Sequence, residues 1–269
     1  MQTIAGKSAS TAKPSLSIAA LALLVGLLAP SGASADEADA RKLLKTMSDY
    51  LEAQKAISFQ YDTNLEIVSK DKQKLGLASS GTVALNRPDK IRVTRTGGFA
   101  DVEFLFDGKT LTLFGKTANL YGQLAVPGTI DHLIDELREK HGRPVPGADL
   151  LLSNVYDELM LGVVNVKDLG SGVIGGVECD HLAFRTKEVD WQIWIAQGNR
   201  PYPCRYVITS KRVAQAPQYS VTIRDWKTGA EVESGDFSFM NATGAKKMDL
   251  NELPNMDELP NIFAVGGKK

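Results

Sequence analysis

Regular alternation of apolar and polar residues dominates the chain after residue 55 and predicts a β-rich fold. In the clearest stretch, positions 57, 59, 61, 65 and 67 are apolar and the positions between them are mostly polar. A period of two places successive side chains on opposite faces, which is typical of a half-buried antiparallel strand. Shorter stretches with this period follow at 83–85, 91–93, 102–106, 111–113, 120–126, 163–166, 177–184, 189–195, 206–208, 219–223 and 237–239.

Three segments have helical spacing instead. Apolar residues recur at 40, 43, 44, 47 and 51, then at 130, 133, 134 and 137 after a capping Thr129, and at 151, 152, 155 and 159 after Asp149. The order of elements is a helix, several strands, two helices and more strands, with no linker between them. This order predicts a single α+β domain whose helices cover the apolar face of an antiparallel sheet.

The first 35 residues have the pattern of a secretory signal peptide. Lys7 and Lys13 precede an apolar run over 16–28, and a small-x-small sequence ends at Ala35. We expect cleavage after Ala35, which leaves no membrane span in the mature chain; an uncleaved anchor is the alternative. The domain is then 36–248, and residues 249–269, which nearly repeat one Pro-containing acidic pentapeptide, form a loosely ordered tail.

Charge and cysteine content narrow the classes of function. With 31 Lys+Arg against 32 Asp+Glu, the net charge of −1 excludes a strongly basic nucleic-acid-binding protein. Two cysteines in an exported chain predict a disulfide between Cys179 and Cys204. In a simple meander they lie two strand spacings apart, so the chain near Pro201 and Pro203 must fold over a strand end to join them. A catalytic thiol is the weaker alternative.

Enzyme and metal motifs are weak. The glycine-rich segment 170–175 matches a dinucleotide fingerprint, but it precedes a predicted strand rather than a helix and is therefore expected to form a turn. Cys179 and His181 share a strand face without a third metal ligand. We therefore predict a non-enzymatic protein with no cofactor and no metal, and an enzyme that uses Asp180 and His181 is the weakest alternative.

Two motifs carry a family resemblance. The sequence Gly-Thr-Val-Ala-Leu-Asn-Arg-Pro at 81–88 and the sequence Phe-Asp-Gly-Lys-Thr-Leu at 106–111 follow a long strand that opens with Ser58 and Phe59. They resemble the LolA/LolB superfamily of periplasmic lipoprotein carriers. Over its full length the chain looks most similar to a group of predicted periplasmic proteins, the domain of unknown function 2092.

The resemblance implies a strongly curved antiparallel half-barrel, with helices over its concave face and an apolar cavity that accepts acyl chains. By motif, it implies that Arg87 contacts the helical lid. Alternation and the resemblance together predict seven cavity-lining residues, although a filled core is the alternative for the same side chains. These residues are Phe59, Tyr61, Leu85, Ile91, Val93, Phe104 and Phe106.

We therefore predict an exported, periplasmic, non-enzymatic protein that binds an acyl chain or a lipidated partner. Its expected partner is a lipid or a lipidated protein. The alternative is a protein-interaction or envelope-stress-sensing module, because the fold of this superfamily also occurs in a regulator of that kind.

Overall fold

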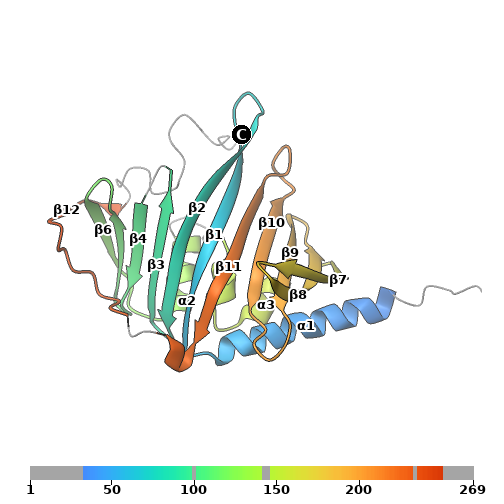
Figure 1. Ribbon diagram of the computed structural model, residues 1–269. Helices are drawn as coiled ribbons and strands as arrows, with labels where there is room; N and C mark the ends of the chain where they lie inside the picture. Colours follow the sequence, from blue (N-terminus) through green and yellow to red (C-terminus); the bar gives the residue numbers. More distant parts are fainter. Residues whose placement is uncertain (1–32, 99–100, 141–145, 233–234, 251–269) are drawn as a thin grey trace, which may run out of the picture. The chain divides into compact units, whose positions relative to one another are not determined.

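The computed structural model describes residues 33–98, 101–140, 146–232 and 235–250 (Figure 1). Strands account for nearly half of these residues, more than any other element. They are β1 (Ala56–Val68), β2 (Lys74–Asn86), β3 (Lys90–Gly97), β4 (Asp101–Phe106), β5 (Thr110–Gly115), β6 (Leu120–Ala125), β7 (Asn165–Ile174), β8 (Val177–Arg185), β9 (Val189–Ala196), β10 (Pro203–Ser210), β11 (Gln218–Thr228) and β12 (Lys246–Lys247).

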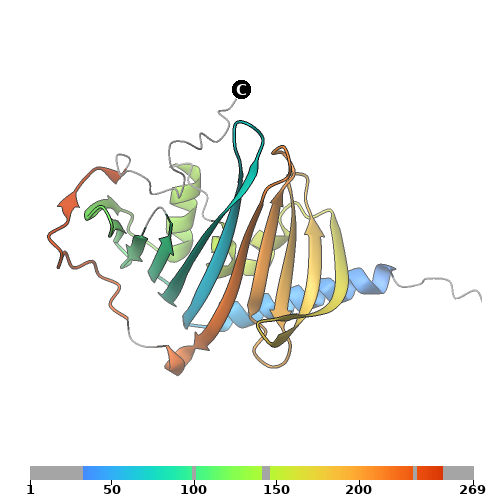
Figure 2. The ribbon, with the colours of Figure 1, turned by 45° about the horizontal axis from the view of Figure 1, so that its top comes forward.

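All twelve strands form one sheet in the order β12-β6-β5-β4-β3-β2-β1-β11-β10-β9-β8-β7. Two meanders meet where β11 pairs with β1, so the long β1 lies near the middle of the sheet (Figure 2). The pairs are antiparallel except for β12, which runs parallel to β6. The predicted α+β class with an antiparallel sheet is confirmed. The sheet is open, ending at β12 and β7, and its strand order does not establish the strong curvature of the predicted half-barrel.

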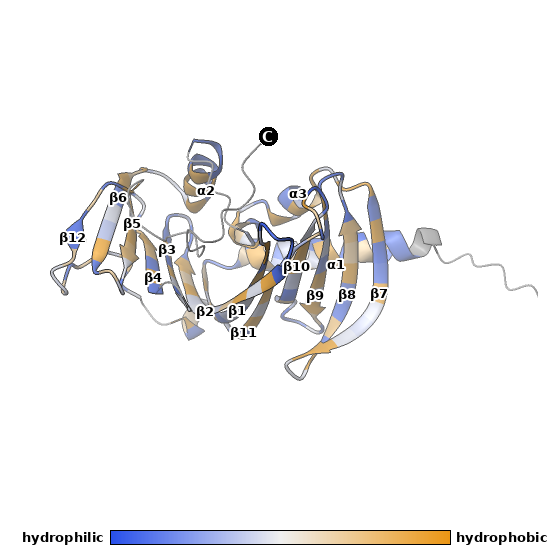
Figure 3. Cartoon of the chain, turned by 90° about the horizontal axis from the view of Figure 1, so that it is seen from above, coloured by the Kyte–Doolittle hydropathy of each residue, from blue (hydrophilic) through white to orange (hydrophobic). Residues whose placement is uncertain are grey.

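The helices lie on one side of this sheet (Figure 3). They are α1 (Ala33–Ala53), α2 (Ile130–Glu139) and α3 (Val155–Met160), with short 3₁₀ turns η1 (Ala148–Leu151) and η2 (Gly229–Glu231). Thr129 caps α2 as predicted, because its side chain accepts a hydrogen bond from the backbone N–H of His132. The predicted leader lies mostly outside the described residues, so its cleavage stays a prediction. The same is true of most of the C-terminal tail, from residue 251 onward.

Three local predictions were wrong. The helix expected from Asp149 is divided into η1 and α3, because Leu152 is extended and the backbone N–H of Ser153 bonds to Asp131 instead. The segment 237–239 forms no strand; Phe239 packs on Phe114 and Tyr121. The glycine-rich segment 170–175 largely continues β7 past a bulge, and only its last residue lies in the turn.

Candidate functional site

The predicted cavity residues share the face of the sheet on which the helices lie, which we call the inner face. Strand register places Phe59 opposite Val83, and it aligns Leu85, Ile91 and Phe106 in one row across β2, β3 and β4. Phe59, Tyr61, Leu85, Ile91 and Phe106 are buried in the main core, whereas Val93 and Phe104 are partly buried at its margin. The structure therefore brings together all seven predicted residues, while a cavity among them stays a prediction.

The apolar sides of two helices close the inner face. Ala40, Leu44, Met47 and Leu51 of α1 belong to the same core as the sheet residues. The apolar residues of α2 that were predicted from its spacing are buried in this core as well. The interior between sheet and helices is therefore lined by hydrocarbon and aromatic side chains.

Aromatic residues from distant segments stack within this interior. The ring of Trp226 lies between Phe59 and Tyr202, at centroid distances of 5.4 and 5.3 Å, and its indole N–H donates to the hydroxyl of Tyr50 in α1. Sequence reasoning missed Trp226 as part of this face. The stack ties α1 to the middle of the sheet.

The side chain of Tyr61 lies over Gly81, where only a glycine leaves room for it. Its hydroxyl donates to the carbonyl of Thr94 at 2.8 Å, and the side chain crosses β2 at Gly81. A Cβ on Gly81 would lie 1.9 Å from the carbonyl oxygen of Thr94 and 2.7 Å from the hydroxyl of Tyr61. The glycine that opens the first resemblance motif therefore makes room for an aromatic side chain of the inner face.

A buried polar pair joins η1 to β10. The hydroxyl of Tyr206 donates to Oδ2 of Asp149 at 3.0 Å, while Oδ1 of Asp149 is buried and has no hydrogen-bond partner among the described residues. Burial raises the pKa of Asp149, and the hydrogen bond from Tyr206 offsets this only in part. Burial and the neighbouring carboxyl also raise the pKa of Tyr206. Sequence reasoning did not identify this pair, because the two residues are far apart in the chain.

Arg87 lies where the β2–β3 turn meets two helices. Its backbone N–H donates to the carbonyl of Lys55 just after α1, and the carbonyl of Pro88 accepts from Ile130 at the start of α2. Nε and Nη2 of its guanidinium are buried and have no hydrogen-bond partner in the described part of the chain. The turn backbone thus contacts the helical side, while the lid contact implied for the Arg87 side chain stays a prediction.

The two cysteines approach each other without forming the expected disulfide. Cys179 of β8 and Cys204 of β10 are buried together beside Ala196 of β9, and both are free thiols. A bulge next to Pro203 places Cys204 beside the end of β9, but that strand still separates the two backbones. Burial raises the pKa of both thiols, which does not suit a catalytic nucleophile.

Asp180 and His181 do not form an acid–base pair. The ring of His181 stacks on Trp194 at 4.0 Å and hydrogen-bonds Gln192, whereas Asp180 accepts from Gln197. As neighbours on one strand, they face opposite sides of the sheet. Within the described ranges, no group of three or more His, Cys, Asp or Glu residues is placed to hold a metal ion.

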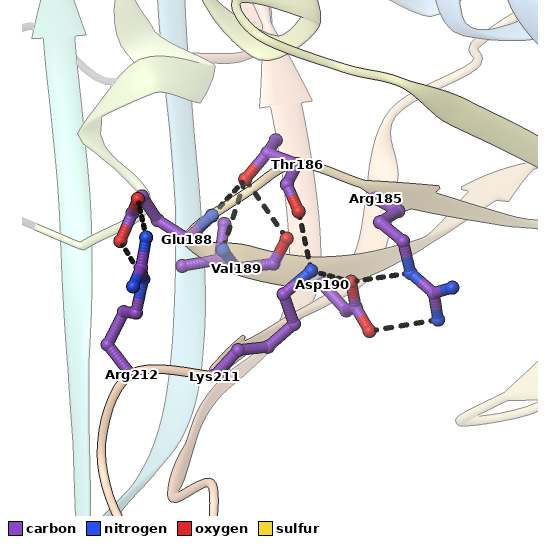
Figure 4. Close-up of polar contacts among 7 residues, drawn as sticks. All are labelled: Arg185, Thr186, Glu188, Val189, Asp190, Lys211 and Arg212. Atoms are coloured by element: carbon purple, nitrogen blue, oxygen red, sulfur yellow. Dashed lines mark hydrogen bonds and ion pairs between the residues drawn. The ribbon is translucent and has the colours of Figure 1, made fainter.

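A polar network joins the β8–β9 hairpin to the loop between β10 and β11 (Figure 4). The carboxylate of Asp190 accepts from Arg185 and from Lys211, and Glu188 pairs with Arg212 at 2.7 Å. Burial disfavours the charged form of Asp190, but the hydrogen bonds from Arg185 and Lys211 outweigh it and lower the pKa of this carboxyl. The network is exposed and polar, so it fits a structural role.

Replacing Asp190 with asparagine is expected to lower the free energy of unfolding by about 0.2–1 kcal/mol, because exposed ion pairs contribute little. Urea unfolding at low and high salt measures the effect, which should shrink at high salt. The contribution is present above the unfolded-state pKa and is lost as the pH falls through the lower folded-state pKa. An effect that is several times larger and independent of salt would contradict a solvent-exposed network.

Comparison with solved structures finds matches at low identity and with TM-scores below 0.5. The Mycobacterium tuberculosis lipoprotein LppX is 15% identical, with 73% of this chain and 100% of that chain covered, at a TM-score of 0.46. MucB of Pseudomonas aeruginosa, in the structure of its complex with MucA, is 13% identical, with coverage of 75% and 61% and a TM-score of 0.44. A LolA superfamily protein from Nitrosomonas europaea is 14% identical, with coverage of 74% and 97% and a TM-score of 0.35.

Sequence comparison assigns the family. No curated protein matches the chain. Among the described residues, no helix is long and apolar enough to cross a membrane. A family model described as "Predicted periplasmic protein (DUF2092)" matches residues 40–251. This description agrees with the periplasmic location that the N-terminal sequence predicts. The chain belongs to this family of predicted periplasmic proteins.

Proposed function

We propose that this protein binds an acyl chain, carried by a lipid or a lipidated partner, between the inner face and the helices. One observation carries the proposal. In the cross-strand row that continues from Phe59 and Val83, the members on β3 to β5 are only partly buried, namely Val93, Phe104 and Leu113. Ile91 and Phe106 in the neighbouring row are buried. The cover over the apolar face therefore thins over β3 to β5.

The energetics suit a hydrocarbon ligand. Burial of apolar surface contributes about 0.8 kcal/mol per methylene group, so roughly ten methylenes supply ~8 kcal/mol before ordering costs. Those costs include displacement of the helices that close the interior. A dissociation constant of about 1 μM needs about 8 kcal/mol net, so a chain of ten methylenes is expected to bind more weakly than this and longer chains to approach it.

Val93 provides a sharp test, since its neighbour Thr94 faces the other side of β3. Replacing Val93 with aspartate is expected to weaken binding of N-phenyl-1-naphthylamine, a neutral fluorescent probe, by about tenfold or more, because a carboxylate disfavours hydrocarbon nearby. Fluorescence titration with dodecanol as competitor measures the effect. The matched Thr94→Asp variant should bind within about twofold of the wild type.

Circular dichroism establishes that both variants fold before binding is compared. If the probe binds neither the wild type nor the control, or binds all three proteins equally, acyl-chain binding at the inner face is refuted.

A protein partner is the second candidate, and the β7 edge of the sheet favours it. Leu161, Val164, Leu169 and Val173 are four of the six large apolar side chains that are exposed in the described chain. They lie in or just before β7, which pairs with β8 on one side only. Native mass spectrometry of protein purified from cells separates the two functions: bound lipid supports acyl-chain binding, and a stoichiometric protein supports the alternative.

A further inference from the structure

We propose that Arg87 binds the anionic head group of the acyl ligand, so that the preferred ligand is an amphiphile with a carboxylate or phosphate head. This inference rests on the proposed function and adds the chemistry of the polar end. It assigns Arg87 a direct contact with ligand rather than a contact with the helical cover.

The position of Arg87 fits the end of an apolar chain. Along β2, Val83 and Leu85 point to the inner face, and Arg87 follows them at the next alternate position, just past the end of the strand. The two acids whose charges act on it, Asp131 of α2 and Glu52 of α1, come from helices on that same side. The guanidinium therefore lies between sheet and helices, where the apolar inner face ends.

The bonding of Arg87 is incomplete. Among the residues that the structure describes, none accepts a hydrogen bond from the buried Nε and Nη2, and neither Asp131 nor Glu52 forms an ion pair with them. The carboxylate of Asp131 already accepts hydrogen bonds from the backbone N–H and the hydroxyl of Ser153. Buried donors of a charged group are costly unless they are bonded. A ligand oxygen is the partner that this site lacks.

The charge of Arg87 is also incompletely balanced. Burial lowers the pKa of Arg87, and the carboxylates of Asp131 and Glu52 offset this only in part. A guanidinium in this situation favours a further negative charge. A carboxylate or phosphate presents two oxygens to the Nε and Nη2 fork, which makes it a better fit than a single neutral carbonyl.

The backbone holds this fork in place. The hydrogen bonds from Arg87 to Lys55 and from Ile130 to Pro88 are both 2.8 Å long, and they fix the turn between the end of α1 and the start of α2. A side chain on a fixed turn loses less conformational freedom when it binds, which raises affinity for a matching head group.

The test compares ligands that share one chain and differ in the head. Competition against N-phenyl-1-naphthylamine is measured for dodecanoate, dodecyl phosphate, dodecanol and methyl dodecanoate. The wild type is expected to bind the two anions about tenfold or more tightly than the two neutral compounds. In Arg87→Gln this preference should fall to about twofold or less, mainly through weaker binding of the anions. Arg224→Gln, an exposed arginine of β11, should keep the preference.

Each of the other outcomes contradicts a different part of the proposal. Equal binding of anionic and neutral compounds by the wild type refutes the role of Arg87 but leaves acyl-chain binding intact. Equal weakening of all four compounds in Arg87→Gln shows that Arg87 controls the helical cover instead. Competition by inorganic phosphate as strong as that of dodecyl phosphate shows a phosphate site without a lipid. Failure of every compound to bind the wild type refutes the proposed function itself.

A variant that keeps the positive charge allows the test to be completed if Arg87→Gln does not fold. Arg87→Lys retains the charge but loses the planar fork, so it should keep part of the preference for anions. If Arg87→Gln does not fold, a wild-type-like preference in Arg87→Lys shows that charge alone suffices and refutes recognition by the fork. A partly reduced preference in a folded Arg87→Lys supports recognition by the charge and the fork together.

Discussion

Replacing Leu44 with alanine is expected to lower the free energy of unfolding by about 2–5 kcal/mol, a large part of the ~5–15 kcal/mol typical of a domain. Leu44 is 0% exposed in the middle of α1 and belongs to the core between helix and sheet. The loss has two sources, the transfer of the missing methyl groups and the void left behind. Urea unfolding followed by circular dichroism measures it.

Lys42 is the matched control, since it is exposed on the same helix. Lys42→Ala should change the free energy of unfolding by less than about 0.5 kcal/mol. If Leu44→Ala costs no more than Lys42→Ala, α1 does not pack on the sheet in solution. A helical cover that ligands displace would then be untenable.

Replacing Asp149 with asparagine is expected to stabilise the protein at neutral pH. Burial raises the folded-state pKa of Asp149 above its unfolded value, so the folded state holds the proton more tightly. Stability is therefore fully present below the unfolded-state pKa and is lost as the pH rises through the folded-state pKa. Asparagine keeps an acceptor for Tyr206 but does not ionise, so this loss should disappear.

The gain in the free energy of unfolding depends on the difference between the folded-state and unfolded-state pKa of Asp149, at about 1.4 kcal/mol for each pKa unit. Urea unfolding of wild type and Asp149→Asn across a pH series should show curves that meet below about pH 4 and separate as the pH rises. Asp157→Asn, an exposed acid of α3, should follow the wild-type curve. Curves that separate at low pH and meet at high pH would reverse the sign and disprove a raised folded-state pKa of Asp149.

Alternation identifies residues that share a face because it depends only on the two-residue period of a strand. Phe59, Leu85 and Phe106 come from three separate segments and share the inner face in the register, while the cavity expected among them stays a prediction. Trp226 was missed because β11 is irregular there. In the pairing of β1 with β11, Phe59 alone faces two residues, Asp225 and Trp226. This bulge brings Trp226 to the inner face, where regular alternation would have placed Asp225.

Other features depend on contacts between distant segments, which a local pattern does not contain. Asp149 and Tyr206 form their pair only when η1 lies against β10. The division of the third predicted helix depends on Asp131, which lies 22 residues before Ser153. The cysteine pair was correctly placed on two strands separated by one other, but bond formation depends on details of the backbone near Pro203.

The two ends of the sheet differ in a way that limits self-association. At one end β12 has only Lys246 and Lys247, and such short, charged strands resist pairing with another sheet. At the other end β7 offers ten residues, Asn165–Ile174. Two molecules joined edge to edge through β7 would use up the long edge of both, so pairing of this kind would be expected to stop at a dimer rather than continue into a fibre.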